Sequence, residues 1–311
     1  MTTKVTVSII TYNHEQFIAQ ALESALAQEV NFDYEILVGE DQSSDRTREI
    51  VRDYAARYPE RIRVFLHDYP EDYVRINGNR NFFNNILNAR GDYIALLEGD
   101  DYWTDSLKLR KQVDFLDQHT ECSACFHNVR VLHEGNPEHD RTFHSTPLKK
   151  KFFTLSDIVS AHFIPTCSTM FRNGFYSSFP DWFYKVSMGD WPLHVLNAEH
   201  GSYGYIDNVM AVYRVHPAGL WSGSKTITIL ERTIEAAKFI NDYLGDRCSR
   251  EMAKRIKRWE GSLEHELLRN DLQAGDVVAA CSRFVQTVMK RPSGRYFRKG
   301  LRSIAKHLLK T

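Results

Sequence analysis

Short apolar runs alternate with amphipathic segments over the first part of the chain. The apolar runs have the length and composition of strands, and they are Val5–Ile10, Tyr34–Val38 and Ile62–Leu66. In the segments that follow them apolar residues recur at helical spacing, over Gln16–Gln28, Arg46–Tyr58 and Asn79–Ala89. Strands that alternate with helices favour a mostly parallel sheet with helices on both faces. The pattern therefore predicts an α/β fold.

The pattern changes twice farther along the chain. It predicts a helix at Leu107–Gln118, a strand near Ala124–Val131, a polar loop at His133–Lys151, and short strands near Ser168–Phe171 and Tyr205–Tyr213. From Thr226 onward the spacing is helical, with breaks at Gly245, Gly275 and Pro292. We therefore expect an α/β domain over residues 1–225 and a helical C-terminal extension over residues 226–311.

The composition is that of an ordinary globular protein. The 311 residues include 40 Lys and Arg and 40 Asp and Glu, and this balance argues against a general nucleic-acid-binding protein. No apolar segment approaches the roughly 20 residues that cross a bilayer. Met1 leads so directly into the first strand that a signal peptide does not fit. We therefore expect a cytoplasmic protein.

Five cysteines in a chain without a secretion signal favour reduced thiols over a disulfide framework. Cys122 and Cys125 form a C-x-x-C pair, but no second pair at zinc spacing accompanies them. Because both lie in an apolar, strand-like run, we interpret them as buried thiols without a metal or redox role.

Three carboxylates cluster at the end of a fourth apolar run. Glu98, Asp100 and Asp101 follow Tyr93–Leu97, where a buried strand is expected to end. Binding sites of open α/β sheets lie beyond the carboxyl ends of their strands. Clustered carboxylates repel one another unless a cation lies between them, and Mg²⁺ or Mn²⁺ with a nucleotide diphosphate fits this need. The alternative is a solvated acidic turn before the next helix, with Asp105 as its cap.

The turns after the first two strands carry polar residues of another kind. No G-x-G-x-x-G follows the first strand, and no G-x-x-x-x-G-K-[ST] occurs in the sequence. A dinucleotide-dependent oxidoreductase and a P-loop NTPase are therefore disfavoured. Instead, T-Y-N at residues 11–13 follows the first strand, and E-D-Q-S-S-D-R-T at residues 40–47 follows the second.

Together with E-G-D-D-Y-W at residues 98–103, these two turns resemble, in order and spacing, the family 2 glycosyltransferases of the GT-A fold. The resemblance extends to about Lys225. It implies a Rossmann-like, mixed but mostly parallel sheet and a hexosyltransferase-type enzyme that inverts the configuration at the sugar carbon. It also implies a place in bacterial cell-surface polysaccharide assembly.

The resemblance assigns nucleotide contacts to the first turns. Thr11, Tyr12 and Asn13 match the turn where an aromatic ring stacks on the base and the backbone meets the base edge. Asp41 matches the acid that accepts a hydrogen bond from the imide N–H of a uracil-like base. Arg80 matches an arginine whose planar guanidinium suits phosphate oxygens. The alternative for Arg80 is a surface ion pair at the start of a helix.

At the acidic strand end the family usually shows Asp-x-Asp-Asp, whereas here the first acid is Glu98. The side chain of Glu98 keeps the charge but is longer, which changes the group it can reach. The resemblance assigns Asp100 to the metal and the nucleotide diphosphate, and Asp101 to a supporting position or a helix cap. His216 is a second candidate metal ligand, because imidazole suits Mn²⁺ and can also donate to phosphate oxygens.

Asp190 stands in an apolar, aromatic segment at the place of the family's general base. Inversion at the sugar carbon requires that the acceptor hydroxyl lose its proton on the face opposite the leaving nucleotide, and a carboxylate can accept that proton. The alternative for Asp190 is a helix cap. Arg214 would offset charge on the departing phosphate. Trp221, between Gly219 and Gly223, would close over the bound donor as a lid.

These residues predict an enzyme that moves a sugar from a UDP- or dTDP-sugar to a hydroxyl of a glycan or lipid-linked glycan, with Mn²⁺ or Mg²⁺ as its cofactor. One alternative is a catalytically silent scaffold that binds sugar nucleotides. Another is a nucleotidyltransferase that makes sugar nucleotides, which would be expected to carry a glycine-rich, basic first loop that this sequence lacks.

The last part of the chain is basic and amphipathic. Leu301, Ile304, Leu308 and Leu309 recur at helical spacing among Lys and Arg residues. Such a helix can lie on an anionic membrane, which predicts a peripheral contact at the inner face of the membrane. The alternative is a solvated helix whose apolar stripe packs on its own domain. The helical extension also offers a surface for a homodimer.

Overall fold

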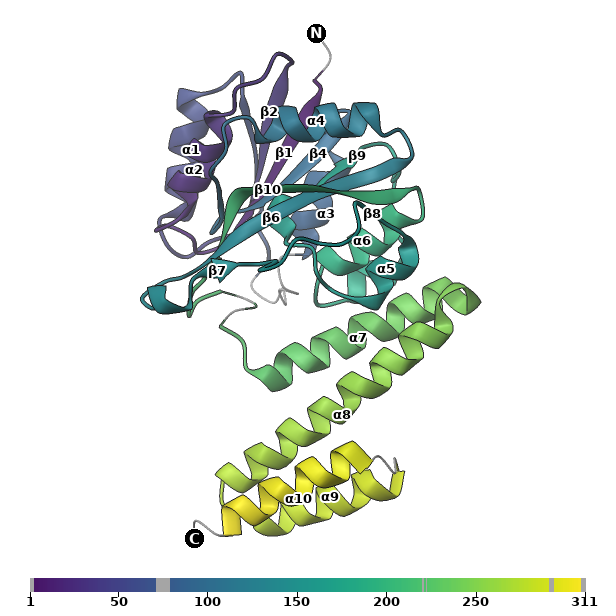
Figure 1. Ribbon diagram of the computed structural model, residues 1–311. Helices are drawn as coiled ribbons and strands as arrows, with labels where there is room; N and C mark the ends of the chain where they lie inside the picture. The colour runs from purple at the N-terminus through teal and green to yellow at the C-terminus, as the bar shows by residue number, and fades with distance from the viewer. Residues whose placement is uncertain (1–2, 71–78, 220, 222, 291–293, 309–311) are drawn as a thin grey trace. The chain divides into compact units, whose positions relative to one another are not determined.

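The computed structural model describes residues 3–70, 79–219, 221, 223–290 and 294–308. The chain divides into two compact units, unit 1 over residues 1–222 and unit 2 over residues 223–311. Unit 1 holds a β-sheet with its covering helices, and unit 2 is helical (Figure 1).

Unit 1 is built on one mixed sheet. Its strands are β1 (Val5–Thr11), β2 (Tyr34–Glu40), β3 (Ile62–Leu66), β4 (Tyr93–Glu98), β5 (Tyr102–Trp103), β6 (Cys122–His133), β7 (Arg141–Thr142), β8 (Phe152–Phe153), β9 (Met170–Arg172) and β10 (Ser202–Val215). The order along the sheet is β3-β2-β1-β4-β9-β6-β10-β5, while β7 pairs with β6 and β8 with β10. Strands β3, β2, β1 and β4 are parallel neighbours, and β10 is parallel to β6. Strand β9 is antiparallel to both β4 and β6 and joins the two parallel groups.

Helices cover both faces of this sheet. They are α1 (Ile18–Leu26), α2 (Thr47–Arg57), α3 (Asn79–Leu87), α4 (Lys108–Gln118), α5 (Leu155–Ser160) and α6 (Asp190–Ala198), with 3₁₀ turns η1 (Pro137–His139), η2 (Thr166–Ser168) and η3 (Phe183–Lys185). Side chains alternate between the two faces of a strand, and Val7 and Val38 lie in the core that β1 and β2 form with α1, α2 and α4. On the opposite face α3 comes so close to Gly39 that an added Cβ would lie 1.7 Å from Asn81 Oδ1. Glycine at this position therefore permits the contact between α3 and the sheet.

The predicted α/β fold, with a mixed, mostly parallel sheet and helices on both faces, is confirmed. Strand β3 has the predicted bounds, whereas the first helix is shorter than predicted and ends before Gln28. The side chain of Gln28 instead bridges to the carbonyl oxygen of Asp105 and the backbone N–H of Leu109. The segment predicted as a polar loop contains β7, which pairs with β6. Cys122 and Cys125 are buried free thiols, as predicted.

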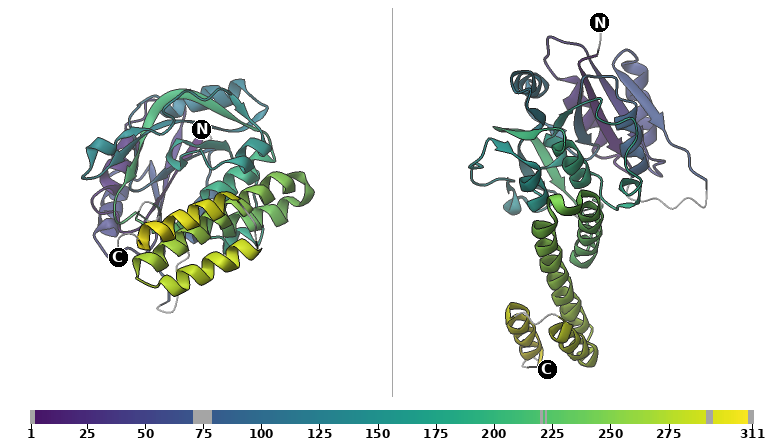
Figure 2. Two further views of the ribbon diagram at one scale, coloured as in Figure 1. Left: turned by 60° about the horizontal axis from the view of Figure 1, so that its bottom comes forward. Right: turned by 90° about the vertical axis from the view of Figure 1, so that its right-hand side faces the viewer.

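Unit 2 consists of α7 (Thr226–Leu244), η4 (Gly245–Arg247), α8 (Ser249–Gln273), α9 (Val277–Lys290) and α10 (Gly294–Leu308). Helices α9 and α10 pack beside the last part of α8 (Figure 2). Leu268 and Leu272 of α8 meet Ala280 and Phe284 of α9 in a small core. The predicted breaks near residues 245 and 275 are confirmed, and the glycine at 275 has the positive φ of 79° that commonly ends a helix. The break predicted at Pro292 lies outside the described residues.

Among the helices that the structure describes, none combines the length and the hydropathy needed to cross a membrane.

Candidate functional site

Three neighbouring strands deliver the predicted site residues to one edge of the sheet. The register pairs Thr11 of β1 with Glu40 of β2, and Ile10 of β1 with Glu98 of β4. The turns that follow these strands therefore lie side by side. The end of β10 comes to the same region, because β10 pairs with β5, the short strand directly after the acidic turn.

The turn after β1 is bonded to the turn after β2. Asn13 Oδ1 accepts a hydrogen bond from the backbone N–H of Ser44 at 2.8 Å, and the backbone N–H of Asp41 donates to the carbonyl oxygen of Thr11 at 3.1 Å. Asn13 has a φ of 53°, in the left-handed region that Asn adopts more readily than most residues. Thr11 is buried, whereas Tyr12, between Thr11 and Asn13, is only half-buried. The two turns thus form one bonded unit with an aromatic ring at its surface.

Asp41 and Arg80 are linked through Tyr69, which the sequence did not single out. The Tyr69 hydroxyl donates to Asp41 Oδ1 at 2.6 Å, and the guanidinium carbon of Arg80 lies 5.3 Å from the centroid of the Tyr69 ring. The backbone N–H of Tyr69 donates to the side chain of Gln42. The Asp41 carboxyl is therefore presented as an acceptor in a group of residues that comes from three separate segments.

Asp100 lies between two imidazoles. His216 Nε2 is 3.1 Å from Asp100 Oδ2, and His14 Nε2 is 3.7 Å from the same oxygen. The ring of Phe17 packs against His216 at a centroid distance of 4.8 Å. Burial alone would raise the pKa of Asp100, but His14 and His216 outweigh burial and hold that pKa below its ordinary value. Asp100 is therefore ionised at neutral pH.

This arrangement fits a divalent cation. Carboxylate oxygen and imidazole nitrogen are both ligands of Mn²⁺, and nucleotide sites hold such ions with one or two carboxylates plus substrate phosphates. Burial lowers the pKa of His14, which favours a neutral imidazole beside the cation. Within the described part of the chain, no three His, Cys, Asp or Glu side chains form a metal site by themselves. A cation near Asp100 and His216 would therefore need further ligands from a substrate.

Arg214 is hydrogen-bonded to two residues of the acidic turn, Asp100 and Asp101. The backbone N–H of Arg214 donates to Asp101 Oδ1 at 2.8 Å, and Arg214 Nη1 donates to the carbonyl oxygen of Asp100 at 2.7 Å. The guanidinium of Arg214 also binds the side chains of Glu134 and Gln20. Burial raises the pKa of Asp101 well above its ordinary value, and the charge of Asp100 adds to this effect. Arg214 is thus fixed in place, with its charge next to Asp100.

Glu98 is the acid at which this sequence departs from the family pattern. Burial raises the pKa of Glu98 to about 8, and the charges of Asp100 and Asp190 contribute to the rise. Its Oε2 is buried and has no hydrogen-bond partner among the described residues. A protonated Glu98 can donate a hydrogen bond to a ligand oxygen.

Asp190, the first residue of α6, is paired with a histidine that the sequence did not single out. His162 Nε2 lies 2.9 Å from Asp190 Oδ2, and the ring of Trp221 lies 6.4 Å from the His162 ring. Burial alone would raise the pKa of Asp190, but His162 outweighs burial and holds it far below its ordinary value. In turn, burial would lower the pKa of His162, but Asp190 reverses this and raises it. His194, one turn along α6, is buried and its pKa is lowered to about 4 by burial.

Sequence reasoning thus missed three residues of this region, His14, Tyr69 and His162. His14 directly follows the T-Y-N turn and could have been found as an extension of that motif. Tyr69 lies in a segment without a recognisable pattern, and only the course of the chain in space brings it to Asp41. His162 begins the segment 162–172, which by the family resemblance forms part of the acceptor side, but its pairing with Asp190 was not predicted.

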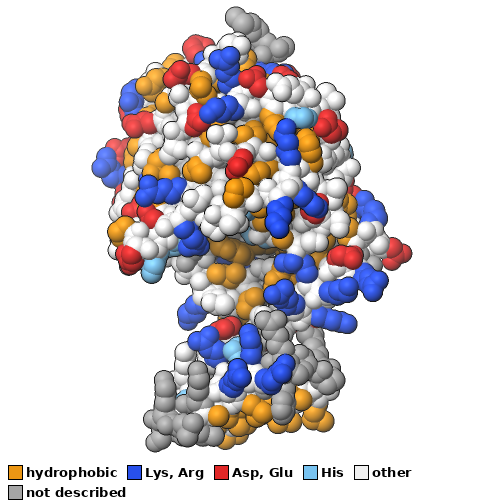
Figure 3. Space-filling view, in the orientation of Figure 1, with side chains coloured by type: hydrophobic (Ala, Val, Ile, Leu, Met, Phe, Trp, Pro, Cys, Tyr) orange, Lys and Arg blue, Asp and Glu red, His pale blue; other side chains and the backbone are white. Residues whose placement is uncertain are grey.

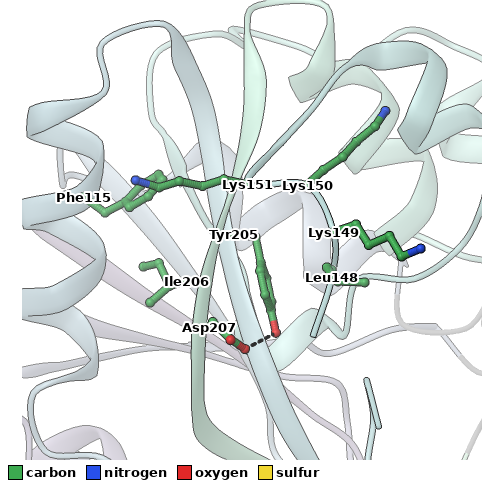
Figure 4. A pocket seen from close by; sticks show the side chains of 8 residues that line it. All are labelled: Phe115, Leu148, Lys149, Lys150, Lys151, Tyr205, Ile206 and Asp207. Carbon is green, nitrogen blue, oxygen red and sulfur yellow. Dashed lines mark hydrogen bonds between the residues drawn. The ribbon is translucent and has the colours of Figure 1, made fainter. Parts of the chain in front are cut away.

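A separate open pocket of about 490 Å³ lies elsewhere on unit 1. Its lining residues are Phe115, Leu148, Lys149, Lys150, Lys151, Tyr205, Ile206 and Asp207 (Figure 4). The Tyr205 hydroxyl donates to Asp207 Oδ1 of the same strand at 3.0 Å, and Lys150 pairs with Asp157 at 2.6 Å. No residue of the predicted site lines it.

Solved structures of two glycosyltransferases are similar to this chain. The mannosyltransferase PcManGT from Pyrobaculum calidifontis, in complex with GDP-Man and Mn²⁺, matches with a TM-score of 0.57 and 15% identity, over 100% of this chain and 87% of that chain. S. aureus TarS 1-349, in complex with UDP-GlcNAc, matches with a TM-score of 0.55 and 15% identity, over 98% of this chain and 80% of that chain. Identity this low carries the fold alone, and that fold is GT-A.

Curated proteins give closer sequence matches. The chain is 39% identical over 218 residues to the uncharacterized protein Rv1520 of Mycobacterium tuberculosis. The aligned region covers 70% of this chain and 60% of that protein. It is 25% identical over 248 residues to the putative teichuronic acid biosynthesis glycosyltransferase TuaG of Bacillus subtilis. This aligned region covers 76% of this chain and 91% of that protein. The family model described as "Glycosyl transferase family 2" matches residues 6–179, more than half of the sequence. The chain therefore belongs to glycosyl transferase family 2.

Proposed function

We propose that this chain is a metal-dependent, inverting glycosyltransferase that uses a UDP- or dTDP-sugar and a hydroxyl of a glycan or lipid-linked glycan. One observation carries the proposal. Asp100 Oδ2 lies 3.1 Å from His216 Nε2 and 3.7 Å from His14 Nε2 at the strand ends, and Asp190 Oδ2 lies 2.9 Å from His162 Nε2 at the start of α6. Asp100 suits a cation that binds the donor diphosphate, and Asp190 suits the acceptor hydroxyl.

The donor would bind along the turns after β1 and β2. The half-buried ring of Tyr12 offers a face for the base, and the Asp41 carboxyl offers an acceptor for an imide N–H. Arg80 is exposed beside Tyr69, where its guanidinium can reach phosphate oxygens. PcManGT and TarS, which are described as complexes with GDP-Man and Mn²⁺ and with UDP-GlcNAc, support a nucleotide-sugar donor.

Asp100 and His216 would hold Mn²⁺ or Mg²⁺. When bound, such an ion neutralises charge on the diphosphate and so favours its departure. Arg214 adds positive potential from its fixed position on the carbonyl oxygen of Asp100. Protonated Glu98 would donate a hydrogen bond to a sugar or ribose oxygen of the donor.

Asp190 would act as the general base. Its carboxylate accepts the proton of the acceptor hydroxyl, the acceptor oxygen forms a bond to the anomeric carbon, and the bond from that carbon to the diphosphate oxygen breaks on the opposite face. The nucleoside diphosphate leaves with the bonding electron pair, and the configuration of the sugar is inverted. His162 is a positioning residue that holds the Asp190 carboxylate ionised, and Trp221 beside it would cover the bound sugar.

We infer the cellular role with the help of one named relative. TuaG is named for teichuronic acid biosynthesis, and it supports a role for this chain in cell-surface polysaccharide assembly at the cytoplasmic face of the membrane.

A thermal-shift screen of nucleoside diphosphates with and without Mn²⁺, followed by transfer assays with labelled sugar nucleotides, tests this proposal. We expect UDP or dTDP to raise the melting temperature more with Mn²⁺ than with EDTA, and the matching sugar nucleotide to give metal-dependent turnover. Nucleotide binding without turnover on any acceptor would instead indicate a silent scaffold. Release of pyrophosphate from a nucleoside triphosphate and a sugar phosphate would indicate a nucleotidyltransferase.

A further inference from the structure

Helix α9 of unit 2 exposes an apolar face. Val278, Val285 and Met289 have 82%, 52% and 79% of their surface accessible. Their spacing along the sequence places them on one side of the helix. The remaining exposed residues of α9 whose side chains the structure describes are Ser282 and Gln286, so this side has no charge there. We call these five residues the α9 face.

The α9 face is not the side by which α9 packs within unit 2. Ala280 and Phe284 form the contact with Leu268 and Leu272 of α8. Large, exposed, uncharged side chains on one helix face mark an interaction surface when they are contiguous. The inner side of α9 is therefore already buried, and the α9 face remains for a partner.

The segment that forms α9 and α10 is basic, and of its cations Arg283 pairs with Asp271 of α8. From Val277 to Thr311 the sequence has nine Lys and Arg residues and no Asp or Glu. Arg298, Lys299 and Arg302 of α10 are exposed. Hydrophobic side chains gather along the lower edge of unit 2 beside Lys and Arg side chains (Figure 3).

We propose that α9 and α10 bind the surface of an anionic lipid membrane. The α9 face would enter the boundary between headgroups and acyl chains, and the cations of α10 would contact lipid phosphates. A second copy of this chain is disfavoured as the partner, because the exposed cations Arg298, Lys299 and Arg302 of two copies would come close together. A nucleic acid would use the cations but leave the uncharged α9 face without a contact.

The structure changes which residues carry the membrane contact that the sequence predicted. Ile304 of α10 packs on the core of unit 2, and Gly300 of α10 lies against Phe284 of α9. The predicted apolar stripe of α10 is thus used inside unit 2 at Ile304, while Leu309 lies outside the described residues. The apolar part of the membrane contact thus comes mainly from α9, which sequence reasoning had not considered, together with Leu301 of α10, which has 44% of its surface exposed.

Sedimentation of the full chain with lipid vesicles tests the proposal independently of catalysis. We expect binding to vesicles of phosphatidylglycerol and phosphatidylcholine, weak binding to phosphatidylcholine alone, and loss of binding at high salt. Val278→Glu with Met289→Glu should weaken binding at least about tenfold, since it places charges in the apolar boundary. Arg298→Gln with Arg302→Gln should weaken binding about fivefold for each cation removed.

Matched variants of unit 1 serve as controls. Val209→Glu makes the same exchange at a valine with 48% of its surface exposed, and Arg46→Gln with Arg110→Gln removes two exposed cations. Neither control should change vesicle binding, and circular dichroism should show unchanged helix content in every variant. Equal binding to both kinds of vesicle, or equal binding by the α9 variants and the controls, would overturn the proposal. If the chain formed a dimer and Val278→Glu dissociated it, the partner of the α9 face would be a second copy of the chain and not a membrane.

Discussion

Asp190 and His162 form the pair on which the proposed proton transfer depends. Asp190→Asn keeps the size of the side chain but removes the carboxylate that accepts the proton. We expect the transfer rate to fall by about 10²–10⁴-fold, while the dissociation constant of UDP with Mn²⁺ stays nearly unchanged. Radiolabelled transfer assays and calorimetric titration measure the two quantities. Asp181→Asn, at an exposed aspartate of the preceding segment, is the control, and turnover retained in Asp190→Asn would remove Asp190 from its role.

His162→Gln should change the pH dependence of the reaction. His162 holds the pKa of Asp190 below its ordinary value, so its loss raises that pKa and Asp190 takes up a proton at higher pH. The acid limb of the profile of kcat/KM against pH is therefore expected to move to higher pH, with a smaller effect near pH 8. His139→Gln, at an exposed histidine, should leave the profile in place. An unshifted acid limb in His162→Gln would mean that His162 has only a structural role.

Lys108 is a fully buried amine whose Nζ donates to Gln112 Oε1 at 2.7 Å and lies 3.8 Å from the centroid of the Trp103 ring. Burial lowers the pKa of Lys108 to about 7, whereas a lysine in the unfolded chain has a pKa of about 10.4. At pH values between these two pKa values, the unfolded chain therefore binds more protons than the folded chain. The free energy of unfolding should rise with pH across this window, by up to about 1.4 kcal/mol per pH unit, and this contribution is lost as pH falls toward 7.

Lys108→Met should remove that slope. We expect the variant to gain stability relative to the unsubstituted chain as pH falls from about 10 to about 7, measured by urea unfolding at a series of pH values. Lys149→Met, at an exposed lysine, should leave the slope unchanged. A stability difference between Lys108→Met and the unsubstituted chain that does not vary with pH would contradict this account.

At the scale of elements, α3 connects the proposed donor side of the site to the proposed acceptor side. Asn81 Nδ2 donates to the carbonyl oxygen of Gly39 at the end of β2, and Asn79 Nδ2 donates to the carbonyl oxygen of Val186 before Asp190. Both amides are buried, so their hydrogen bonds fix the position of α3. The helix that begins with Asn79 thus sets the place of two predicted site segments at once.

Gly39→Ala should disturb this connection. The added Cβ would lie 1.7 Å from Asn81 Oδ1 and 2.8 Å from Asn85 Oδ1. We expect a loss of about 1–3 kcal/mol in the free energy of unfolding, measured by the denaturant midpoint. Gly261→Ala in α8 is the matched control, because nothing lies within 4 Å of its Cβ. That variant should gain up to about 1 kcal/mol, and an equal response of both variants would rule out the steric explanation.

The elements themselves were largely predictable. The periodicity of apolar residues gave β3 its observed bounds and placed α2 within one residue at either end. It did not reveal β7, because Arg141 and Thr142 form a strand only through pairing with Val131 and Arg130 of β6. Short edge strands of this kind depend on pairing with another strand. Two residues are too few to show an alternation of polar and apolar side chains.

At the scale of the whole molecule, all of the predicted nucleotide and catalytic residues lie in unit 1. UDP with Mn²⁺ is therefore expected to slow amide hydrogen exchange in the turns after β1, β2 and β4, and to leave α8 and α9 unchanged. Exchange followed by mass spectrometry measures this, with AMP and Mn²⁺ as the control ligand. Protection confined to α8 and α9 would place the nucleotide on unit 2.

The sequence by itself determined the strand and helix pattern, the family, and the positions of the strand-end acids, because these depend on local spacing and on short motifs. Tertiary structure decided which partners those acids have. Asp100 gains His14 and His216, Asp190 gains His162, and Arg214 is held on the acidic turn. Contacts between residues so far apart in sequence arise from the order of strands in the sheet and from burial, and no local pattern encodes either of them.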